Sequence, residues 1–179
     1  MLIDGLWIML GAYAAGAIVS LPGRLSSRAT RLSGHVALLI GALTGVFLAL
    51  PCMANGVPPP ALQAALPPCF AFANMVIVVD GLSAFFLLVV SAVAIAAAIY
   101  GPAYLDSHST ASPAVEGVGI NLFVGCMALV LCAGDALTFL LAWEGMTLAS
   151  YALVVSEAAR RTRTPDSSIS SWPTPAPRS

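Results

Sequence analysis

Lysine is absent from the chain, and seven arginines and eight acidic residues supply nearly all the charge of its 179 residues. Charged residues make up 8% and hydrophobic residues 59% of the sequence, whereas a soluble domain carries roughly 25% charged residues. With a mean hydropathy of +0.94, this balance excludes a water-soluble globular domain. It also excludes a disordered chain, which requires low hydrophobicity and high charge. The scattered arginines form no basic face, so no nucleic-acid partner is expected.

Cysteine is scarce, and the sequence lacks the common catalytic motifs. Cys126 and Cys132 are six positions apart in an apolar run, so on a helix they face different directions and form no local metal pair. Cys52 and Cys69 flank an outer segment where a disulfide could form, although free thiols acting as small apolar side chains are the simpler interpretation. No serine-hydrolase, zinc-protease or phosphate-loop motif is present. We therefore expect no catalytic residue, no cofactor and no metal on this chain.

Long apolar runs predict an all-α, polytopic transmembrane helix bundle of about five spans. A helical span needs about 20 mostly apolar residues. Suitable runs lie near 1–21, 34–52, 81–105, 118–133 and 136–156. Together they define a transmembrane domain over residues 1–156. Prolines between residues 54 and 73 predict an extended outer loop followed by a short strand near 75–79, and a polar loop is expected over 106–117.

The placement of arginine predicts the topology. One cluster follows the first span and a second follows the fifth: Arg24, Arg28, Arg31, Arg160, Arg161 and Arg163. Positively charged segments stay cytoplasmic, and four spans separate the clusters, so both lie on the same side. The N-terminus is therefore expected outside the cell and the C-terminus in the cytoplasm, with the chain crossing the inner (plasma) membrane several times.

The tail over residues 157–179 differs from the rest in being rich in Ser, Pro, Thr and Arg. Read as written, it predicts disorder. We also hypothesise a shifted reading frame near Arg163. In the alternative frame, each new codon takes the last base of one codon and the first two bases of the next. A serine codon of the form TCN then yields a codon for Phe, Leu, Ile or Val, so the tail can be read as an apolar continuation of the membrane domain.

Glu144 is the strongest candidate for chemistry, because it lies near the middle of the fifth apolar run. An acidic residue at the centre of a membrane helix costs roughly 2.5 to 3.5 kcal/mol on insertion scales, and such residues usually face a protein interior or a water-filled path. Thr147 and Tyr151 follow three and seven positions later on the same helix face. The three side chains form a polar stripe suited to a proton pathway. The alternative is a lone acid that pairs with a neighbouring helix to fix packing.

Three further ionisable residues are weaker candidates for proton transfer. Asp80 and Asp135 each precede a predicted span, and they fit helix N-caps at the membrane surface better than secondary proton sites. His108 lies in the polar loop expected over 106–117 and fits a solvated side chain, although a histidine there could also supply protons at the cytoplasmic mouth.

Three segments carry a resemblance to a known family: residues 79–86 (VDGLSAFF), 99–105 (IYGPAYL) and 135–151 (DALTFLLAWEGMTLASY). They resemble the antiporter-like membrane subunits, which are shared by respiratory complex I, Mrp-type sodium/proton antiporters and the membrane arms of hydrogenases. The hydrogenase-4 type is the most similar branch. The resemblance covers roughly Met75 to Val155, and the pattern around Trp143 and Glu144 is its most specific part.

The resemblance implies that Glu144 matches the glutamate of the family's fifth helix, a proton-pathway residue. The family pairs that acid with lysines on later helices, in a bundle of about fourteen helices built from inverted repeats. This sequence has five predicted spans and no lysine. It is therefore interpreted as the N-terminal part of such a subunit.

The implied function is proton translocation in a membrane oxidoreductase complex of hydrogenase or NADH:quinone oxidoreductase type, with redox chemistry on other subunits. The expected partners are the lipid bilayer, other membrane and redox subunits of the complex, and protons, with sodium as an open alternative. Two other functions stay open. One is a non-conducting structural membrane fragment, and the other is a stand-alone cation/proton antiporter.

Overall fold

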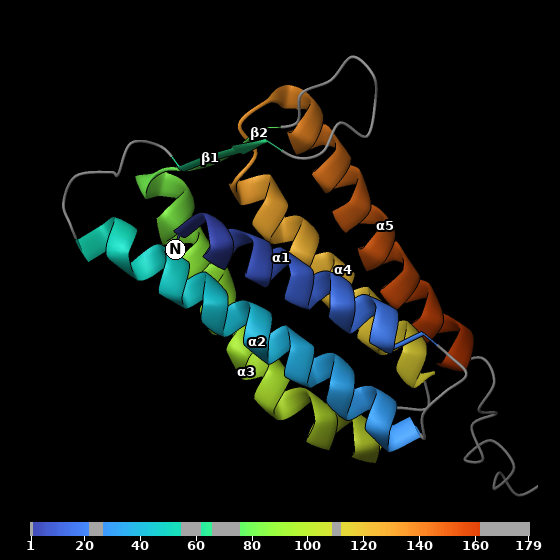
Figure 1. Ribbon diagram of the computed structural model, residues 1–179. Coiled ribbons are helices and arrows are strands. Elements are labelled where there is room, and N and C mark those ends of the chain that lie inside the picture. Colours follow the sequence, from blue (N-terminus) through green and yellow to red (C-terminus); the bar gives the residue numbers. More distant parts are fainter. Residues whose placement is uncertain (1, 22–26, 55–61, 66–75, 109–111, 162–179) are drawn as a thin grey trace, which may run out of the picture.

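The computed structural model describes residues 2–21, 27–54, 62–65, 76–108 and 112–161. Within these residues the chain forms five helices and two short strands (Figure 1). They are α1 (Leu2–Val19), α2 (Ser27–Ala54), β1 (Leu62–Ala65), β2 (Val76–Val79), α3 (Gly81–His108), α4 (Pro113–Leu131) and α5 (Ala136–Arg161). The all-α bundle predicted from the apolar runs is confirmed. The two strands pair as an antiparallel ribbon, and β2 matches the strand predicted near 75–79.

The five helices lie side by side, and successive helices run in opposite directions (Figure 1). α2 packs between α1 and α3, α4 packs against both α1 and α2, and α5 packs along α4 at one side. Helices α2 and α4 therefore begin at the end of the bundle where α1, α3 and α5 finish. Arg28 and Arg31 of α2 and the C-terminal Arg160 and Arg161 of α5 belong to that end, which we call the arginine end. The opposite end carries the strands and is called the ribbon end.

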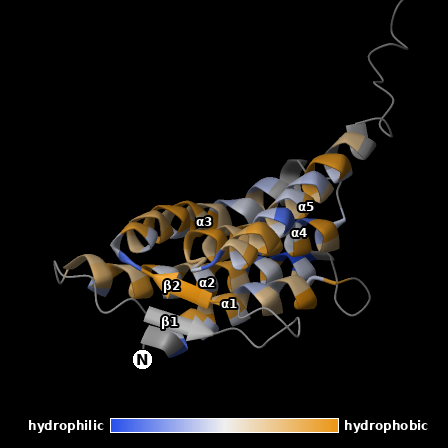
Figure 2. Cartoon of the chain, turned by 90° about the horizontal axis from the view of Figure 1, so that it is seen from above, coloured by the Kyte–Doolittle hydropathy of each residue, from blue (hydrophilic) through white to orange (hydrophobic). Residues whose placement is uncertain are grey.

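Four of the helices are long and apolar enough to cross a membrane, over Arg28–Ala54, Gly81–Tyr104, Pro113–Leu131 and Ala136–Ser156. α1 adds a shorter apolar helix over Asp4–Val19. Figure 2 shows hydrophobic residues along the helices, and large hydrophobic side chains such as Phe47, Leu82 and Ile99 are exposed. Exposed apolar surface of this extent is typical of contact with lipid, so the chain is a multi-pass membrane protein.

Small residues allow α1, α2 and α3 to approach each other closely. A Cβ atom at Gly41 of α2 would lie 2.6 Å from Cε1 of Tyr13 on α1, and the missing side chain at Gly45 leaves room for Ser91 of α3. Lipid tails are as apolar as leucine, so membrane helices associate through close packing and interhelical hydrogen bonds rather than through the hydrophobic effect. Glycines four residues apart on α2 provide that close packing.

The boundaries of α2, α3 and α4 differ from those predicted. α2 continues through Pro51 to Ala54, because the one hydrogen bond that a proline removes is tolerated near the end of a membrane helix. The loop predicted over 106–117 was wrong at both ends, since α3 extends to His108 and α4 begins at Pro113. A proline suits the first helical position, and Glu116 in the first turn interacts favourably with the positive helix N-terminus.

The last helix also extends beyond its predicted end. α5 continues to Arg161, so residues 157–161 are helical rather than part of the tail. Residues 157–161 are alanine, glutamate and arginine, which have high helix propensity. The rest of the tail, residues 162–179, lies outside the described residues, as does most of the predicted outer loop over 54–73.

Candidate functional site

The predicted polar stripe lies on the side of α5 that faces away from the rest of the bundle. Glu144, Thr147 and Tyr151 are all exposed, Tyr151 by 66%. The Oγ1 hydroxyl of Thr147 donates a hydrogen bond of 3.0 Å to the carbonyl of Trp143, one turn earlier. Among the residues that the structure describes, none pairs with the Glu144 carboxylate. The three side chains therefore share one face, and that face is open.

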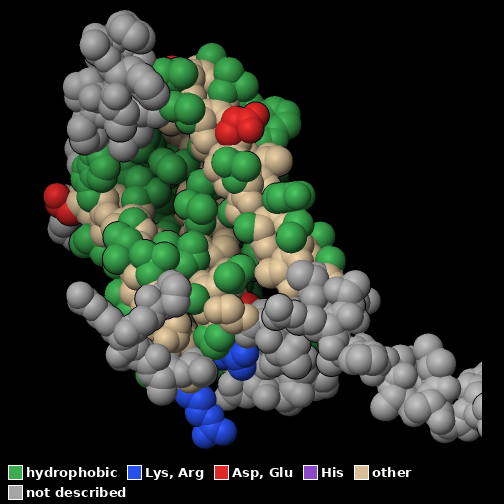
Figure 3. All heavy atoms as spheres, turned by 90° about the vertical axis from the view of Figure 1, so that its right-hand side faces the viewer, with side chains coloured by type: hydrophobic (Ala, Val, Ile, Leu, Met, Phe, Trp, Pro, Cys, Tyr) green, Lys and Arg blue, Asp and Glu red, His purple; other side chains and the backbone are tan. Residues whose placement is uncertain are grey.

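The opposite face of α5 carries small residues that pack closely on α4. Ala142 and Ala149 are buried, and a Cβ atom at Gly145 would lie 2.8 Å from the sulfur of Cys126 on α4. Figure 3 shows that the side of the molecule on which α5 lies is covered largely by hydrophobic side chains, with acidic ones among them. Close packing of the small residues on α4 turns Glu144 outward.

Asp80 and Asp135 lie at the N-termini of α3 and α5, where both carboxylates cap the helix. Oδ1 of Asp80 accepts a hydrogen bond of 2.7 Å from the Ser83 amide, and Oδ1 of Asp135 accepts one of 2.9 Å from the Thr138 amide. Because hydrogen bonds stabilise the charged form, the Ser83 amide lowers the pKa of Asp80. The Thr138 hydroxyl and the amide of Val76 lower the pKa of Asp135 to about 2. Carboxylates that stay charged in this way suit capping better than proton transfer.

Asp135 also joins the ribbon to the connection between α4 and α5. Its Oδ2 accepts a hydrogen bond of 2.7 Å from the amide of Val76. The Gly134 amide donates to the carbonyl of Val76 at 2.8 Å, and the Val78 amide donates to the carbonyl of Cys132 at 2.7 Å. The start of α5 is therefore held against β2, the strand that leads into α3.

A second group of polar side chains lies inside the bundle near the arginine end, and it was not predicted from the sequence. Arg31 of α2 and Glu116 of α4 form an ion pair, with Nε 3.3 Å from Oε2 and each side chain only 10% exposed. In the sequence, Arg31 is a topology signal and Glu116 lies in the segment predicted as a polar loop. If Pro113 is taken as the start of a helix, Glu116 falls in the first turn of that helix rather than in a loop.

His35 lies one turn beyond Arg31 on α2 and is 3% exposed. Its Nδ1 is 2.9 Å from the Arg31 carbonyl oxygen, and a carbonyl only accepts, so Nδ1 donates. Its Nε2 has no hydrogen-bond partner within the described part of the chain. The ring packs on Gly101 of α3, where a Cβ atom would lie 2.8 Å from Cδ2. The signal in the sequence was the four-residue spacing of Arg31 and His35, which places both on one helix face.

Asn121 and Ser20 extend this group toward α1. The amide nitrogen Nδ2 of Asn121 donates to the carbonyls of Gly34 at 3.0 Å and Gly117 at 2.9 Å, and the Ser20 hydroxyl donates to the carbonyl of Gly16 at 2.7 Å. A Cβ atom at Gly117 would lie 2.6 Å from Cβ of Ser20. The glycines thus provide the space in which α1, α2 and α4 meet. Five residues make up this buried polar cluster: Ser20, Arg31, His35, Glu116 and Asn121.

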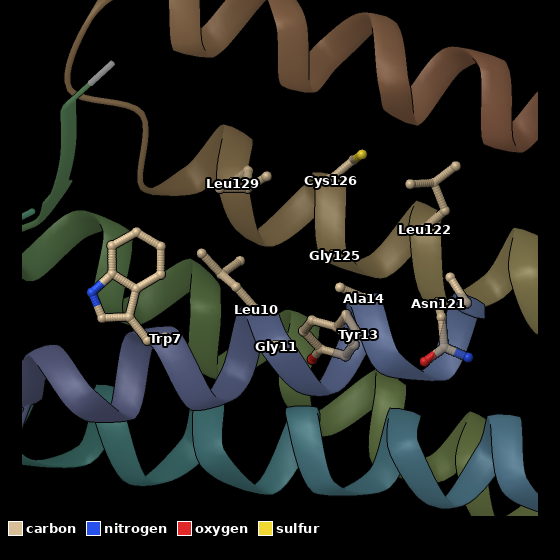
Figure 4. Close-up of a pocket in the computed structure, with 11 residues that line it drawn as sticks. Trp7, Leu10, Gly11, Tyr13, Ala14, Asn121, Leu122, Gly125, Cys126 and Leu129 are labelled. Carbon is tan, nitrogen blue, oxygen red and sulfur yellow. The ribbon is translucent and has the colours of Figure 1, made fainter. Parts of the chain in front are cut away.

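An apolar pocket of about 410 Å³ lies between α1 and α4 (Figure 4). Gly11 and Gly125 contribute no side chains to it, Trp7 and Leu129 lie toward the ribbon end, and Asn121 lies at the other end. Because no charged side chain lines this pocket, it suits a hydrocarbon chain better than a charged substrate. In the described parts of the chain, no three His, Cys, Asp or Glu side chains are placed to hold a metal ion.

The remaining candidates are His108 and the cysteines. His108 is the last residue of α3, and its side chain lies outside the described residues, so its role stays a prediction. Cys52, Cys126 and Cys132 are buried free thiols, in agreement with their interpretation as apolar side chains. Cys69 lies outside the described residues.

The sequence has relatives that are much longer. No family model matches the chain, but it is 31% identical to hydrogenase-4 component B of Escherichia coli (strain K12) over 149 residues, 83% of this chain and 21% of that protein. It is 42% identical over 81 residues to uncharacterized proteins of two Mycobacterium tuberculosis strains, covering 45% of this chain and 12% of each relative. The chain thus spans about a fifth, or less, of the length of these curated relatives. With the apolar helices, the hydrogenase-4 match confirms the family, and the chain belongs to the antiporter-like membrane subunits.

Proposed function

We propose that the chain is the N-terminal part of a proton-translocating, antiporter-like subunit in a hydrogenase-type complex of the inner (plasma) membrane. Its similarity to hydrogenase-4 component B supports the type of complex. The position of Glu144 on α5 supports the transport role. In this proposal the redox chemistry takes place on partner subunits, and this chain contributes membrane helices and a carboxyl group that carries protons.

The single observation that carries the proposal is the open position of Glu144 inside an apolar span. Glu144 lies eight residues after the start of α5 at Ala136, about 12 Å along the helix, within the candidate span Ala136–Ser156. A carboxylate facing lipid tails there costs roughly 2.5 to 3.5 kcal/mol. We infer that this face is covered by protein helices that enclose water, and that the hydroxyls of Thr147 and Tyr151 continue the hydrated path toward the arginine end.

A carboxyl group transfers protons efficiently only if it can exist in both protonation states, and a nearby cation favours the charged one. Arg31, the buried arginine on α2, is already paired with Glu116 at 3.3 Å. The sequence contains no lysine. In this proposal, the cation that regulates Glu144 therefore comes from helices of other segments or subunits.

A structural role without conduction is the second candidate. It is favoured for the isolated chain by the open Glu144 face, which has no described partner, and by the close packing of Gly145 on Cys126. In that case α5 serves as a docking helix, and the carboxylate pairs with a partner helix to fix the packing. A stand-alone antiporter, which would need several copies to enclose Glu144, is the remaining alternative, and sodium transport stays open.

Proton flux into lipid vesicles tests the proposal. The hydrogenase-type complex that contains the full chain is reconstituted into vesicles that contain a pH-sensitive dye, because the proposal places the helices that cover Glu144 on other segments or subunits. A potassium diffusion potential drives proton entry. We expect the complex to conduct and its Glu144→Gln form to be about 100-fold slower, because glutamine keeps the shape but cannot carry a proton. Asp80→Asn is the matched control, since asparagine also caps a helix, and it should keep the parent rate.

The outcomes separate the candidates. Equal flux from the parent complex and its Glu144→Gln form would remove Glu144 from the mechanism and favour the structural role. Glu144-dependent flux from vesicles that contain only this chain would favour the stand-alone antiporter. Dependence of either flux on sodium would show that sodium is transported.

A further inference from the structure

We propose that the pocket between α1 and α4 binds one acyl chain of a phospholipid from the membrane leaflet at the ribbon end. The headgroup of this lipid lies near Trp7, and the acyl chain runs inward along α4 to Asn121. The pocket shares no residue with the polar stripe of α5, so lipid binding there does not depend on the proposed function.

The pocket is a narrow recess between two helices that touch each other. Gly125 of α4 lies against Tyr13 of α1, where an added Cβ atom would be 3.1 Å from the tyrosine Cβ. Helices in contact have axes about 8 to 10 Å apart, whereas a helix with its side chains is about 10 to 12 Å across. A third helix would therefore rest on the rims of the recess, whereas a single hydrocarbon chain is slim enough to enter it.

Small residues of α1 keep the recess open. Gly11, Ala14 and Ala17 line it from that side, and a Cβ atom added at Gly11 would have no neighbour within 4 Å. The volume of about 410 Å³ lies in the usual range of ligand pockets, roughly 300 to 1,000 Å³. Atoms that line an unfilled space lose their dispersion contacts. Filling the recess with an apolar group is therefore favourable.

The polar atoms of the lining residues are turned away from the recess. The Asn121 amide donates through Nδ2 to two backbone carbonyls and places Oδ1 against Gly16. The ring of Tyr13 packs on α2, and the sulfur of Cys126 faces α5. Figure 4 shows the indole nitrogen of Trp7 on the side away from the recess. The described lining thus offers contacts to hydrocarbon and no partner for a polar group.

The length of the recess matches the depth of one leaflet. Leu129 lies two residues before the end of α4 at Leu131, about 3 Å along the helix. Asn121 lies eight residues before Leu129, about 12 Å further into the bundle. The hydrocarbon core of a bilayer is about 30 Å thick, so one leaflet contributes roughly 15 Å. An acyl chain that enters at the ribbon end therefore fills the recess within its own leaflet.

Polarity along this face of α1 changes in the same order as along a phospholipid. Trp7 lies at the ribbon end of the recess (Figure 4), and Asp4 lies three residues earlier on the same helix face. Tryptophan is enriched where hydrocarbon meets headgroups, and its indole N–H can donate to a lipid phosphate or ester. The charged side chains described at this end are all acidic: Asp4, Asp80 and Asp135. They favour a headgroup that carries an ammonium group, as in phosphatidylethanolamine, over an acidic one.

Photolabelling in a defined bilayer tests the proposal. The full chain is placed in phosphatidylethanolamine nanodiscs with a trace of the same lipid that carries a diazirine in one acyl chain, and mass spectrometry locates the labelled residues. We expect the residues that line the recess to be labelled several-fold more than Val93 and Ile99, which are exposed on α3. Equal labelling of the two surfaces would overturn the proposal, because the recess would then contact only bulk lipid.

Two equivalent substitutions on α1 separate the recess from its surroundings. Ala14→Leu places a larger side chain in the recess, whereas Ala15→Leu adds the same side chain on the exposed surface beside it. Each methylene group that loses its place weakens binding about fourfold, so Ala14→Leu should lower the labelling of Leu129 about tenfold. Ala15→Leu should leave it unchanged. Gly11→Leu also fills the recess and covers the case in which Ala14→Leu does not fold. Unchanged labelling in the variants that fill the recess would overturn the proposal.

The headgroup is tested with phosphatidylglycerol that carries the same labelled acyl chain. This acidic lipid should label the recess less than phosphatidylethanolamine does, because acidic side chains lie at the ribbon end. Equal labelling by the two lipids would overturn the role of the headgroup charge.

Labelling of the hydrogenase-type complex distinguishes lipid from protein as the occupant. The recess should be labelled in the complex as it is in the isolated chain. Labelling confined to the isolated chain would show that a protein helix covers the recess in the complex, and it would overturn the lipid proposal. The use of this complex rests on the function proposed above. Glu144→Gln should leave the labelling unchanged, so proton flux and labelling can fail independently.

Discussion

Glu116 and Glu144 lie on neighbouring helices of the same bundle, and only Glu116 has a cationic partner among the described residues. Glu116 points inward from the first turn of α4 and pairs with Arg31 at 3.3 Å. Glu144 lies well inside α5 and points outward. In the inner bundle, an acidic side chain of α4 is paired with an arginine of α2, whereas α5 presents its acidic side chain on an open face without a described partner.

The same contrast holds for the packing of the helices. α2 is enclosed by α1, α3 and α4, and glycines bring these helices together around the buried polar cluster. α5 packs on α4 through one face of small residues and leaves its polar stripe uncovered. Substitutions in the inner bundle should therefore have the largest effects on stability, and substitutions on the open face of α5 the smallest.

The largest effect is expected from breaking the buried ion pair. Arg31→Leu should lower the free energy of unfolding by about 3 to 5 kcal/mol, because it removes a cation that lies 3.3 Å from the buried Glu116 carboxylate. The measurement is reversible unfolding in mixed micelles with increasing dodecyl sulfate. The double variant Arg31→Leu/Glu116→Leu should recover most of the loss. Equal losses in the single and double variants would contradict a coupled pair.

A smaller loss is expected where α1, α2 and α4 meet. Gly117→Val should cost about 1 to 3 kcal/mol through overpacking, since a Cβ atom there would lie 2.6 Å from Cβ of Ser20. Gly11→Ala is the matched control, because no atom lies within 4 Å of the added Cβ and alanine is the better helix former. The same unfolding assay measures both, and an equal loss at Gly11 would show that the close approach at Gly117 is unimportant.

Asp135 at the ribbon end should have an effect of about 1 kcal/mol, the usual value of a helix cap. Asp135→Ala should also accelerate hydrogen exchange of the Val76 amide, which loses its acceptor. Since folding lowers the pKa of Asp135 from 3.8 to about 2, its contribution is complete above about pH 4 and disappears as the pH falls toward 2. Asp135→Asn should retain part of the cap but lose this pH dependence. An unchanged acid limb in Asp135→Asn would argue against this assignment.

The smallest effect on stability is expected at Glu144. Glu144→Gln should change the free energy of unfolding of the isolated chain by less than about 0.5 kcal/mol, because no described partner is lost. Glu116→Gln, measured in the same micelles, should be clearly destabilising. A loss at Glu144 as large as that at Glu116 would reveal a partner for Glu144 within this chain and would remove the contrast between the two acids.

Local signals in the sequence were enough for much of the fold. The apolar runs predicted the helices, and the valine-rich segment near 75–79 predicted β2. The error at the start of α4 had a local cause, because a proline at the first helical position begins a helix rather than interrupting one. The polar stripe of α5 was also visible in the sequence, since three residues on one helix need no tertiary information.

Contiguous residues are enough to predict that the chain crosses a membrane and that one face of α5 carries Glu144, Thr147 and Tyr151, because span length and helical periodicity are local properties. The contacts of Arg31 with Glu116 and of His35 with Gly101 depend instead on how the helices pack. These partners are more than sixty residues apart, and no local pattern specifies which helix faces pack together. The direction in which Glu144 points was decided in the same way, because the small residues on the opposite face of α5 pack against α4.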